Sequence, residues 1–143
     1  MKYTTGSPSE TEKIGFMLAQ SLDGKGQKRA FIALRGEMGV GKTAFVRGFA
    51  GYFGIKSVKS PTYTIVNEYK ANASVFHFDM YRIESEDDLL SIGYDDYVCS
   101  DGYCIAEWSE NVEEDLPADA ITVTISRTSG GDDERLIEIE GLA

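Results

Sequence analysis

The sequence has few cysteines and no long apolar run. Its two cysteines, Cys99 and Cys104, are separated by four residues and have no histidine nearby, which argues against a zinc site and favours reduced, inert thiols. No apolar stretch approaches the ~20 residues that a membrane helix needs. Residues 1–12 are polar and do not form a basic and then apolar leader. We therefore expect a soluble, cytoplasmic protein that is not exported and has no membrane partner.

Basic side chains are also scarce. Lys and Arg number 14 against 24 Asp and Glu, so the formal net charge at pH 7 is −10. Proteins that bind nucleic acid usually carry a basic surface that neutralises phosphates, so this balance argues against direct binding of RNA. Any role near RNA would require a partner protein.

The length and the apolar content indicate one folded domain. The chain has 143 residues, of which 42% are hydrophobic and 11% aromatic. This is close to the usual size of a domain and supplies enough apolar side chains for an ordinary core. Since no repeat, linker or low-complexity tract interrupts the chain, we predict a single domain over residues 1–143.

Hydrophobic periodicity in the first third of the chain predicts a helix, a strand and a second helix. The first element expected is an amphipathic helix that begins at the capping-box pair Ser9 and Glu12. Residues 30–34 form a short apolar run, typical of a strand buried on both faces. Apolar positions then recur at helical spacing from Lys42 toward Gly54, a residue that favours helix termination.

Two pairs of segments have the pattern of antiparallel hairpins. Residues 63–69 and 75–78 read as strands, and the five residues between them are too few for a parallel crossover. Near the end of the chain, residues 121–125 alternate apolar and polar side chains, and residues 137–140 do so after a glycine turn. Each pair is expected to lie side by side in a sheet.

Between these hairpins, the pattern predicts one helix and one buried strand. Ser85 is expected to cap a helix that runs toward Gly93, and residues 103–106 read as a buried strand that ends at Glu107. Strands that alternate with helices, together with hairpins, indicate an α/β fold on a mixed sheet with helices on its faces.

A glycine-rich segment carries the strongest functional signal. Residues 36–43 match the pattern G-x-x-x-x-G-K-[ST], and they lie between a predicted strand and a predicted helix. The glycines allow backbone N–H groups to converge on phosphate oxygens at the helix N-terminus. Lys42 would add a positive charge at the outer phosphates, and the Thr43 hydroxyl could ligate magnesium. The expected nucleotide-binding residues are Gly36, Glu37, Met38, Gly39, Val40, Gly41, Lys42, Thr43 and Ala44. The fold predicted is therefore P-loop NTPase-like.

Two carboxylates follow predicted strands, where an acid can reach magnesium in an open α/β site. Asp79 follows residues 75–78, and Glu107 follows residues 104–106. Each is a candidate ligand for a metal or a water molecule, and each alone could equally be a solvated acid at a strand end. Trp108, the single tryptophan, reads as a packing residue. His77, within a predicted strand, reads as a core residue.

Several P-loop chemistries remain open and one is disfavoured. No Asn/Thr-Lys-x-Asp stretch is present to read guanine, which argues against a GTPase. A small-molecule kinase needs a cationic lid over the transferred phosphoryl group, but the arginines are scattered along the chain. An ATPase is the leading interpretation. The alternatives are a small-molecule kinase and a nucleotide-sensing subunit that does not hydrolyse ATP usefully.

Four blocks of residues together have a more specific pattern than the glycine loop alone. They are residues 36–43 with 45–48, 58–64 with 67–69, 77–82, and 107–110. In order and spacing, they resemble the bacterial TsaE (formerly YjeE) family of P-loop ATPases, which assist threonylcarbamoyl modification of the adenosine next to the anticodon in tRNA. The resemblance runs from the first predicted strand almost to Pro117. Met38 stands where that family usually has leucine, a swap that conserves volume.

The resemblance implies an ATPase that has little turnover by itself and that uses ATP and Mg²⁺. It implies work in a complex with the TsaD and TsaB proteins, in which ATP hydrolysis resets the modifying enzyme between rounds. tRNA would then be contacted only through the complex, which agrees with the acidic charge of this chain.

The resemblance also implies roles for individual residues. Thr62 and Thr64 would belong to a switch-like segment, while Arg135 and residues 9–11 would lie near the adenine. Glu107 is assigned to magnesium and Asp79 to the attacking water, a choice that rests on the resemblance and on Trp108 beside Glu107. The catalytic residues would be Asp79, Lys42, Thr62 and Trp108, the metal ligands Thr43, Glu107 and Asp79, and the nucleotide-binding residues those of the glycine loop together with Arg135.

Overall fold

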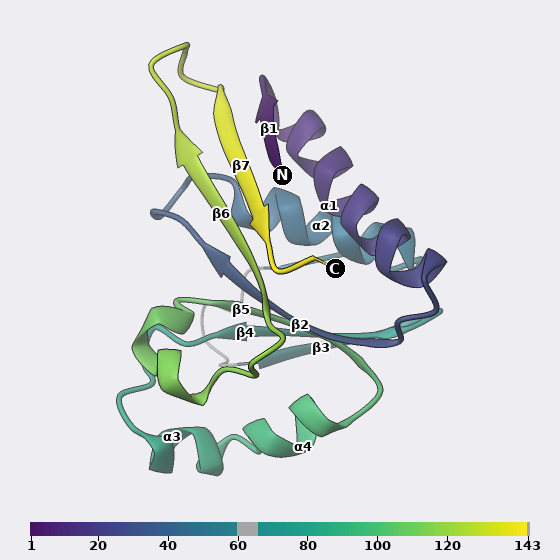
Figure 1. Ribbon diagram of the computed structural model, residues 1–143, viewed down its shortest axis with the longest axis vertical. Coiled ribbons are helices and arrows are strands. Elements are labelled where there is room, and N and C mark those ends of the chain that lie inside the picture. The colour runs from purple at the N-terminus through teal and green to yellow at the C-terminus, as the bar shows by residue number, and fades with distance from the viewer. Residues whose placement is uncertain (60–65, 143) are drawn as a thin grey trace.

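The fold is built on one seven-stranded mixed sheet. The computed structural model describes residues 1–59 and 66–142, and within them the strand order is β1-β7-β6-β2-β5-β4-β3 (Figure 1). The predicted α/β fold, with a mixed sheet, flanking helices and antiparallel hairpins, is confirmed. The strands are β1 (Lys2–Thr5), β2 (Arg29–Arg35), β3 (Val66–Lys70), β4 (Ser74–Asp79), β5 (Gly102–Glu107), β6 (Ile121–Arg127) and β7 (Arg135–Glu140).

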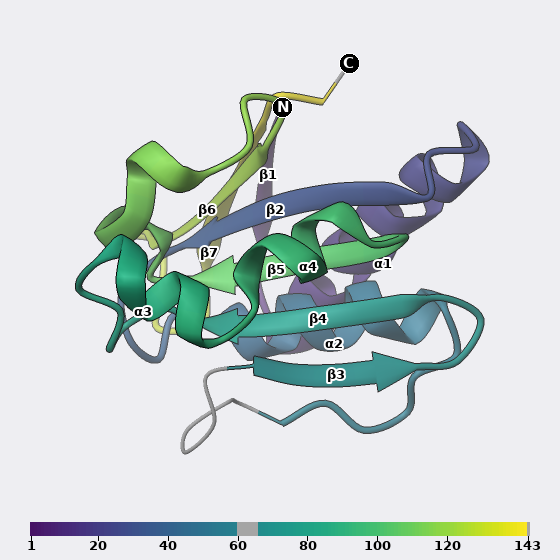
Figure 2. The same ribbon diagram turned by 90° about the horizontal axis from the view of Figure 1, so that it is seen from below.

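Helices cover both faces of this sheet. The longer pair, α1 (Pro8–Gly24) and α2 (Lys42–Tyr52), lies on one face. The shorter pair, α3 (Glu86–Ser91) and α4 (Tyr94–Cys99), lies on the other, as Figures 1 and 2 show. A 3-10 segment, η1 (Ser109–Asp115), follows β5. Among the described residues, no helix is long and apolar enough to cross a membrane.

The central strands run parallel and bring three functional segments to one edge. β2 pairs in parallel with both β5 and β6, and β4 pairs in parallel with β5. The carboxyl ends of β2, β4 and β5 therefore meet at the same side of the sheet, where open α/β sheets bind their ligands. The glycine loop follows β2, Asp79 ends β4 and Glu107 ends β5.

Side-chain alternation along β4 decides which groups face the glycine loop. Phe76 and Phe78 pack into the core cluster under α3 and α4, whereas Val75 packs into the cluster under α1 and α2. Because alternate residues of a strand point to the same face, His77 and Asp79 lie on the side of α2.

The helices α1 and α2 approach each other closely at two glycines. A Cβ atom at Gly15 would overlap the carbonyl oxygen of Phe45, and one at Gly48 would overlap the carbonyl oxygen of Glu12. These glycines therefore allow the two backbones to come within contact distance. The same packing holds α2, and with it the glycine loop at its N-terminus, against the body of the fold.

The N-terminus differs from the prediction in two ways. The first element is the edge strand β1, paired antiparallel with β7, and not a helix. Helix α1 is capped by Ser7, whose Oγ accepts a hydrogen bond from Glu10 N at 3.2 Å, and not by Ser9. The capping pattern S-x-x-E occurs two residues earlier than predicted and has Pro8 at the first helical position, where proline is favoured. Glu12 instead pairs with Arg47 at 2.6 Å.

Other predicted elements are confirmed, with shifted ends. Ser85 caps α3 as predicted, and the two hairpins are antiparallel over the described residues. Residues 63–65 of the predicted strand lie outside them. The helix α4 was not predicted, because Gly93 was read as the end of one helix, whereas it separates two. Helix α2 ends at Tyr52, two residues before Gly54, which has a φ of +89°.

Candidate functional site

The glycine loop between β2 and α2 leaves the N-terminus of α2 open. The backbone φ angles of Gly36, Gly39 and Gly41 are +155°, +76° and +114°, values that residues other than glycine rarely adopt. At Gly36, a Cβ atom would also lie 2.6 Å from the carbonyl oxygen of Ile125. Gly41 is the N-cap, and no side chain among the described residues caps α2. The first N–H groups of the helix are thus available to an anion.

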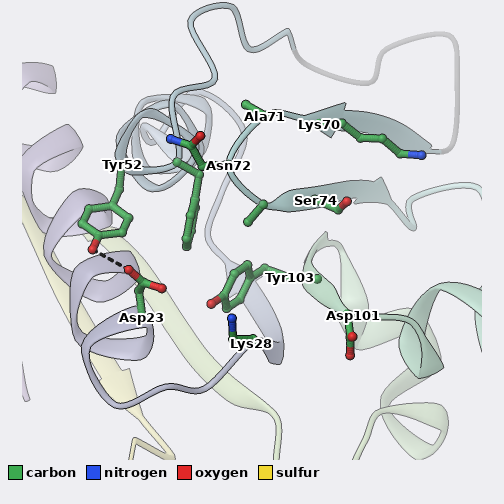
Figure 3. A pocket seen from close by; sticks show the side chains of 12 residues that line it. Asp23, Lys28, Tyr52, Lys70, Ala71, Asn72, Ser74, Asp101 and Tyr103 are labelled. Carbon is green, nitrogen blue, oxygen red and sulfur yellow. Dashed lines mark hydrogen bonds between the residues drawn. The ribbon is translucent and has the colours of Figure 1, made fainter.

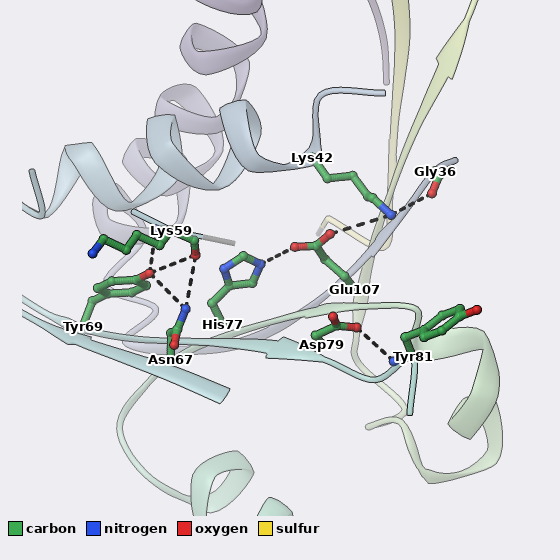
Figure 4. Close-up of polar contacts among 9 residues, drawn as sticks. All are labelled: Gly36, Lys42, Lys59, Asn67, Tyr69, His77, Asp79, Tyr81 and Glu107. Carbon is green, nitrogen blue, oxygen red and sulfur yellow. Dashed lines mark hydrogen bonds and ion pairs between the residues drawn. The ribbon is translucent and has the colours of Figure 1, made fainter. Parts of the chain in front are cut away.

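Lys42 is the cation of this site and is largely buried, with 6% of its surface exposed. Its Nζ atom donates a hydrogen bond to the carbonyl oxygen of Gly36 at 2.8 Å and lies 3.7 Å from Oε1 of Glu107 (Figure 4). It also lies 4.4 Å from the centre of the Trp108 ring, within the range of a cation–π contact. Two segments that are far apart in the sequence, the glycine loop and the end of β5, therefore meet at this ammonium group.

Glu107 connects Lys42 to a buried histidine. Glu107 is 7% exposed, and its Oε2 atom lies 2.5 Å from Nε2 of His77, whose side chain is fully buried. Figure 4 shows the imidazole of His77 pointing along the sheet toward Glu107. The interpretation of His77 as a core residue describes its burial correctly but misses this contact. Nothing in the strand pattern of β4 distinguishes such a histidine from one that only packs.

Asp79 lies beside Glu107 at the carboxyl edge of the sheet. The two residues are direct partners in the parallel register of β4 and β5. The Asp79 side chain is half-buried, and its Oδ1 atom accepts a hydrogen bond from Tyr81 N at 3.0 Å, which shapes the turn after β4. The predicted pair of strand-end acids is therefore brought together, and one Asp79 oxygen is left for another partner.

Trp108 has an unusual backbone conformation directly after Glu107. Its φ of +60° is the one positive value at a non-glycine residue within the described part of the chain. Such backbone strain concentrates at functional sites. The indole ring contacts Lys42, meets Tyr81 edge to face at 5.3 Å and packs against the core under α3 and α4. Trp108 thus combines the packing role expected from the sequence with a contact to the site.

The β6–β7 hairpin holds the glycine loop from the other side. Arg135, for which a place near the adenine is predicted, donates from Nε to the carbonyl oxygen of Val40 at 2.9 Å and so lies next to the loop. Arg127 donates to Glu37 Oε2 at 3.0 Å and to the carbonyl oxygen of Met38 at 3.2 Å. Arg127 was not predicted as a site residue, since a lone arginine at a strand end carries no local signal of this contact.

Lys59, the last described residue before the gap in the described chain, is hydrogen-bonded to β3. Tyr69 OH donates to the carbonyl oxygen of Lys59 at 3.1 Å and accepts from Lys59 N at 2.9 Å, and Asn67 Nδ2 donates to the same carbonyl at 3.2 Å (Figure 4). Asn67 is also the antiparallel partner of His77. The predicted residues Thr62 and Thr64 lie outside the described residues. Residues 9–11 start α1, where Thr11 is buried against the hydroxyl of Thr5 at 3.0 Å.

A cavity of about 660 Å³ lies at the opposite end of the sheet, by the amino end of β5. Figure 3 shows Tyr52 and Asp23 hydrogen-bonded at its wall, at 2.7 Å, a contact that raises the pKa of Tyr52. The hydroxyl of Tyr103 is likewise occupied, because it donates to the carbonyl oxygen of Gln27 at 2.6 Å. Acids and lysines are mixed in its lining, which includes Asp23, Asp101, Lys28 and Lys70. The glycine loop is therefore the stronger candidate.

The oxygen donors at the glycine loop fit magnesium better than a softer metal. Magnesium in nucleotide sites uses one or two protein oxygens and otherwise phosphate and water. The Thr43 hydroxyl and the carboxylates of Glu107 and Asp79 are donors of this kind. Within the described ranges, no three His, Cys, Asp or Glu residues gather as a self-sufficient metal cluster. The donor set is therefore suited to a metal that arrives with phosphate.

Known proteins of one family resemble this chain over most of its length. A family model described as threonylcarbamoyl adenosine biosynthesis protein TsaE matches residues 5–137. The tRNA threonylcarbamoyladenosine biosynthesis protein TsaE of Bacillus subtilis is 38% identical over 139 residues, which cover 96% of this chain and 83% of that protein. The protein of the same name from Haemophilus influenzae is 40% identical over 115 residues, covering 79% and 71%. The crystal structure of YdiB from Bacillus subtilis has a TM-score of 0.78 and 33% identity, covering 96% of this chain and 82% of that one.

Proposed function

The chain belongs to the TsaE family of threonylcarbamoyl adenosine biosynthesis proteins, and from this premise we propose that it is an ATP-binding and ATP-hydrolysing subunit required for threonylcarbamoyladenosine modification of tRNA. It acts in complex with TsaD and TsaB and has little turnover alone. ATP and Mg²⁺ are its cofactors. The proposal places its action in the cytoplasm.

One observation carries the proposal of nucleotide hydrolysis. A buried lysine at the open N-terminus of α2 lies 3.7 Å from a carboxylate at the end of β5, with a second carboxylate beside it in register. Cation, helix N-terminus and paired acids are the groups that phosphoryl transfer needs for positioning and charge stabilisation. The presence of two acids supports hydrolysis over simple anion binding at this loop.

Each residue of the site has its own role in binding phosphate, magnesium or water. The N–H groups of the glycine loop bind the phosphates, and Lys42 exchanges its contact with the Gly36 carbonyl for the outer phosphate oxygens. Thr43 and Glu107 would hold Mg²⁺, which neutralises charge on the phosphates when bound. Asp79 orients the attacking water, while Arg135 supports the loop at Val40 near the nucleotide.

The distribution of charge supports contact with tRNA through partners. Thirteen of the 24 acidic residues lie between positions 84 and 119, a stretch with no Lys, Arg or His. This stretch includes α3, α4 and η1, which pack into one core cluster on one face of the sheet, so most of these acidic residues form an acidic layer on that side of the fold. The remaining chain carries a formal charge of +3, from 14 basic and 11 acidic residues. The acidic layer repels phosphate backbones, and partners would therefore hold the RNA.

Turnover measurements with and without partners test the proposed function. We expect slow phosphate release from ATP by the isolated chain and a clear increase on addition of TsaD and TsaB. A kinase would instead transfer phosphate to an acceptor molecule. A nucleotide sensor would bind ATP and release no phosphate even in the complex. Either of those results would replace the ATPase assignment.

Conservative substitutions of the two strand-end acids should separate their roles. Asp79→Asn keeps an oxygen that can accept from Tyr81 N, so the turn persists; we expect normal nucleotide binding and loss of hydrolysis. Glu107→Gln should weaken the magnesium dependence of ADP binding. Trp108 fluorescence is the measurement. A phosphate that binds Lys42 would change the position of its ammonium group above the indole ring and therefore the fluorescence. The opposite pattern would exchange the two assignments, and a signal indifferent to nucleotide would leave Trp108 a packing residue.

A further inference from the structure

His77 is the single histidine of the chain, and its imidazole is completely buried beside the glycine-loop site. It lies on the face of β4 that α2 covers. Because Asp79 is the register partner of Glu107, His77 is diagonal to Glu107 on the same face, within reach of its long side chain. The register partner of His77 on β5 is the aliphatic Ile105, and its partner on β3 is Asn67. A buried polar ring costs free energy unless it is hydrogen-bonded.

Among the described residues, the imidazole makes one hydrogen bond, and its partner is Glu107. Nε2 lies 2.5 Å from Oε2, while the other carboxylate oxygen faces Lys42. An ionised carboxylate can only accept hydrogen bonds. With Glu107 as the acceptor, the ring hydrogen of His77 lies on Nε2, and His77 is the donor. Nδ1 is buried and has no hydrogen-bond partner within residues 1–59 and 66–142. An aliphatic side chain would fill this space without that unpaired atom, so packing alone does not account for a histidine.

We propose that His77 is a positioning residue that holds the Glu107 carboxylate in place for magnesium and phosphate, an inference that rests on the proposed function. The imidazole holds Oε2 and thereby restricts a side chain that has three rotatable bonds. Oε1 is then directed toward Lys42 and the open end of α2. Hydrogen-bonded partners behind metal-ligating groups typically contribute 10–100-fold to metal affinity or activity.

Two substitutions separate positioning from packing. His77→Leu keeps an apolar side chain of similar size and removes the donor, whereas His77→Gln retains an N–H donor at about the reach of Nε2. Isothermal titration calorimetry on the full chain measures ADP affinity with and without Mg²⁺. We expect His77→Leu to reduce the gain in affinity from magnesium by about 10–100-fold, with unchanged affinity in its absence, and His77→Gln to recover most of the gain.

Phe76→Leu is the matched control, because Phe76 is buried on the opposite face of the same strand. This substitution removes a ring from β4 without touching Glu107. Thermal unfolding of all three variants checks that they fold. We expect Phe76→Leu to lower the unfolding temperature while the magnesium dependence of ADP binding remains that of the wild type.

Nitrogen NMR of the tag-free protein gives a readout that does not depend on nucleotide. A chain with one histidine gives one imidazole signal set, so no assignment is needed. We expect a hydrogen-bearing Nε2 and a bare Nδ1, and a change in both signals in Glu107→Gln. If His77→Leu does not fold, this measurement decides, because a hydrogen on Nδ1 with a bare Nε2 would overturn the inference.

The outcomes also distinguish this inference from the proposed function. Wild-type protein that binds no ADP, with or without magnesium, would overturn the proposed function and the inference with it. Normal wild-type binding and an unchanged magnesium effect in folded His77→Leu would overturn the inference alone. An equal loss of the magnesium effect in His77→Leu and His77→Gln would also overturn the inference, because a hydrogen-bond donor at position 77 would then not influence ADP affinity.

Discussion

Lys42→Ala is expected to lower ATP hydrolysis by on the order of 10²–10³-fold, the loss typical of removing one preorganised charge-stabilising donor. The Nζ atom lies where three parts of the site converge, at Gly36, Glu107 and Trp108. Without it, no cation among the described residues lies within ion-pair distance of Glu107 apart from the ring of His77 when protonated. Phosphate release in the presence of TsaD and TsaB is the measurement.

The fold should survive this substitution, although the Lys42 side chain is largely buried. Glu107 keeps its hydrogen bond to His77, so the carboxylate is not left without a partner. Lys56→Ala is the matched control, since it removes the same charge from an exposed position outside the loop. Circular dichroism verifies folding. Unchanged phosphate release by folded Lys42→Ala would refute the assignment of the glycine loop as the ATP site.

Gly48→Ala is expected to destabilise the protein by about 1–3 kcal/mol, the usual cost of overpacking, and to lower the unfolding temperature by roughly 3–10 °C. Its methyl group would overlap the carbonyl oxygen of Glu12, a backbone atom that cannot move away as a side chain could. Helices α1 and α2 would have to separate. Thermal unfolding followed by circular dichroism measures the effect.

Gly51→Ala, on the same helix, provides the control with the opposite sign. Apart from its chain neighbours and the backbone of α2, no atom of the described residues lies within 4 Å of a Cβ built at Gly51, and its φ is not in the left-handed region. Alanine there restricts the unfolded chain without a clash, so we expect a stability gain of up to about 1 kcal/mol. Equal effects of the two substitutions would show that helix propensity, and not the contact with Glu12, decides the role of Gly48.

Local pattern was sufficient for most elements of the fold. The glycine loop could be read directly, because its glycines, lysine and threonine are neighbours in the sequence and each backbone angle depends on local sterics. The two hairpins and the strand-end acids followed from alternation and turn length. The edge strand β1 could not be predicted, because four residues are too few to show a periodic pattern and their partners in β7 lie 130 to 136 residues away.

The arrangement of the site was decided by the tertiary structure. Sequence alone named Lys42, Asp79 and Glu107, and the parallel register of β4 and β5 brought the two acids together. The bond between His77 and Glu107 joins residues 30 positions apart, and the contact of Arg127 with Glu37 joins residues 90 apart. Side-chain type and periodicity are local properties, whereas which side chains meet depends on strand order and register. That is why the chemistry of the loop could be predicted from the sequence and its supporting contacts could not.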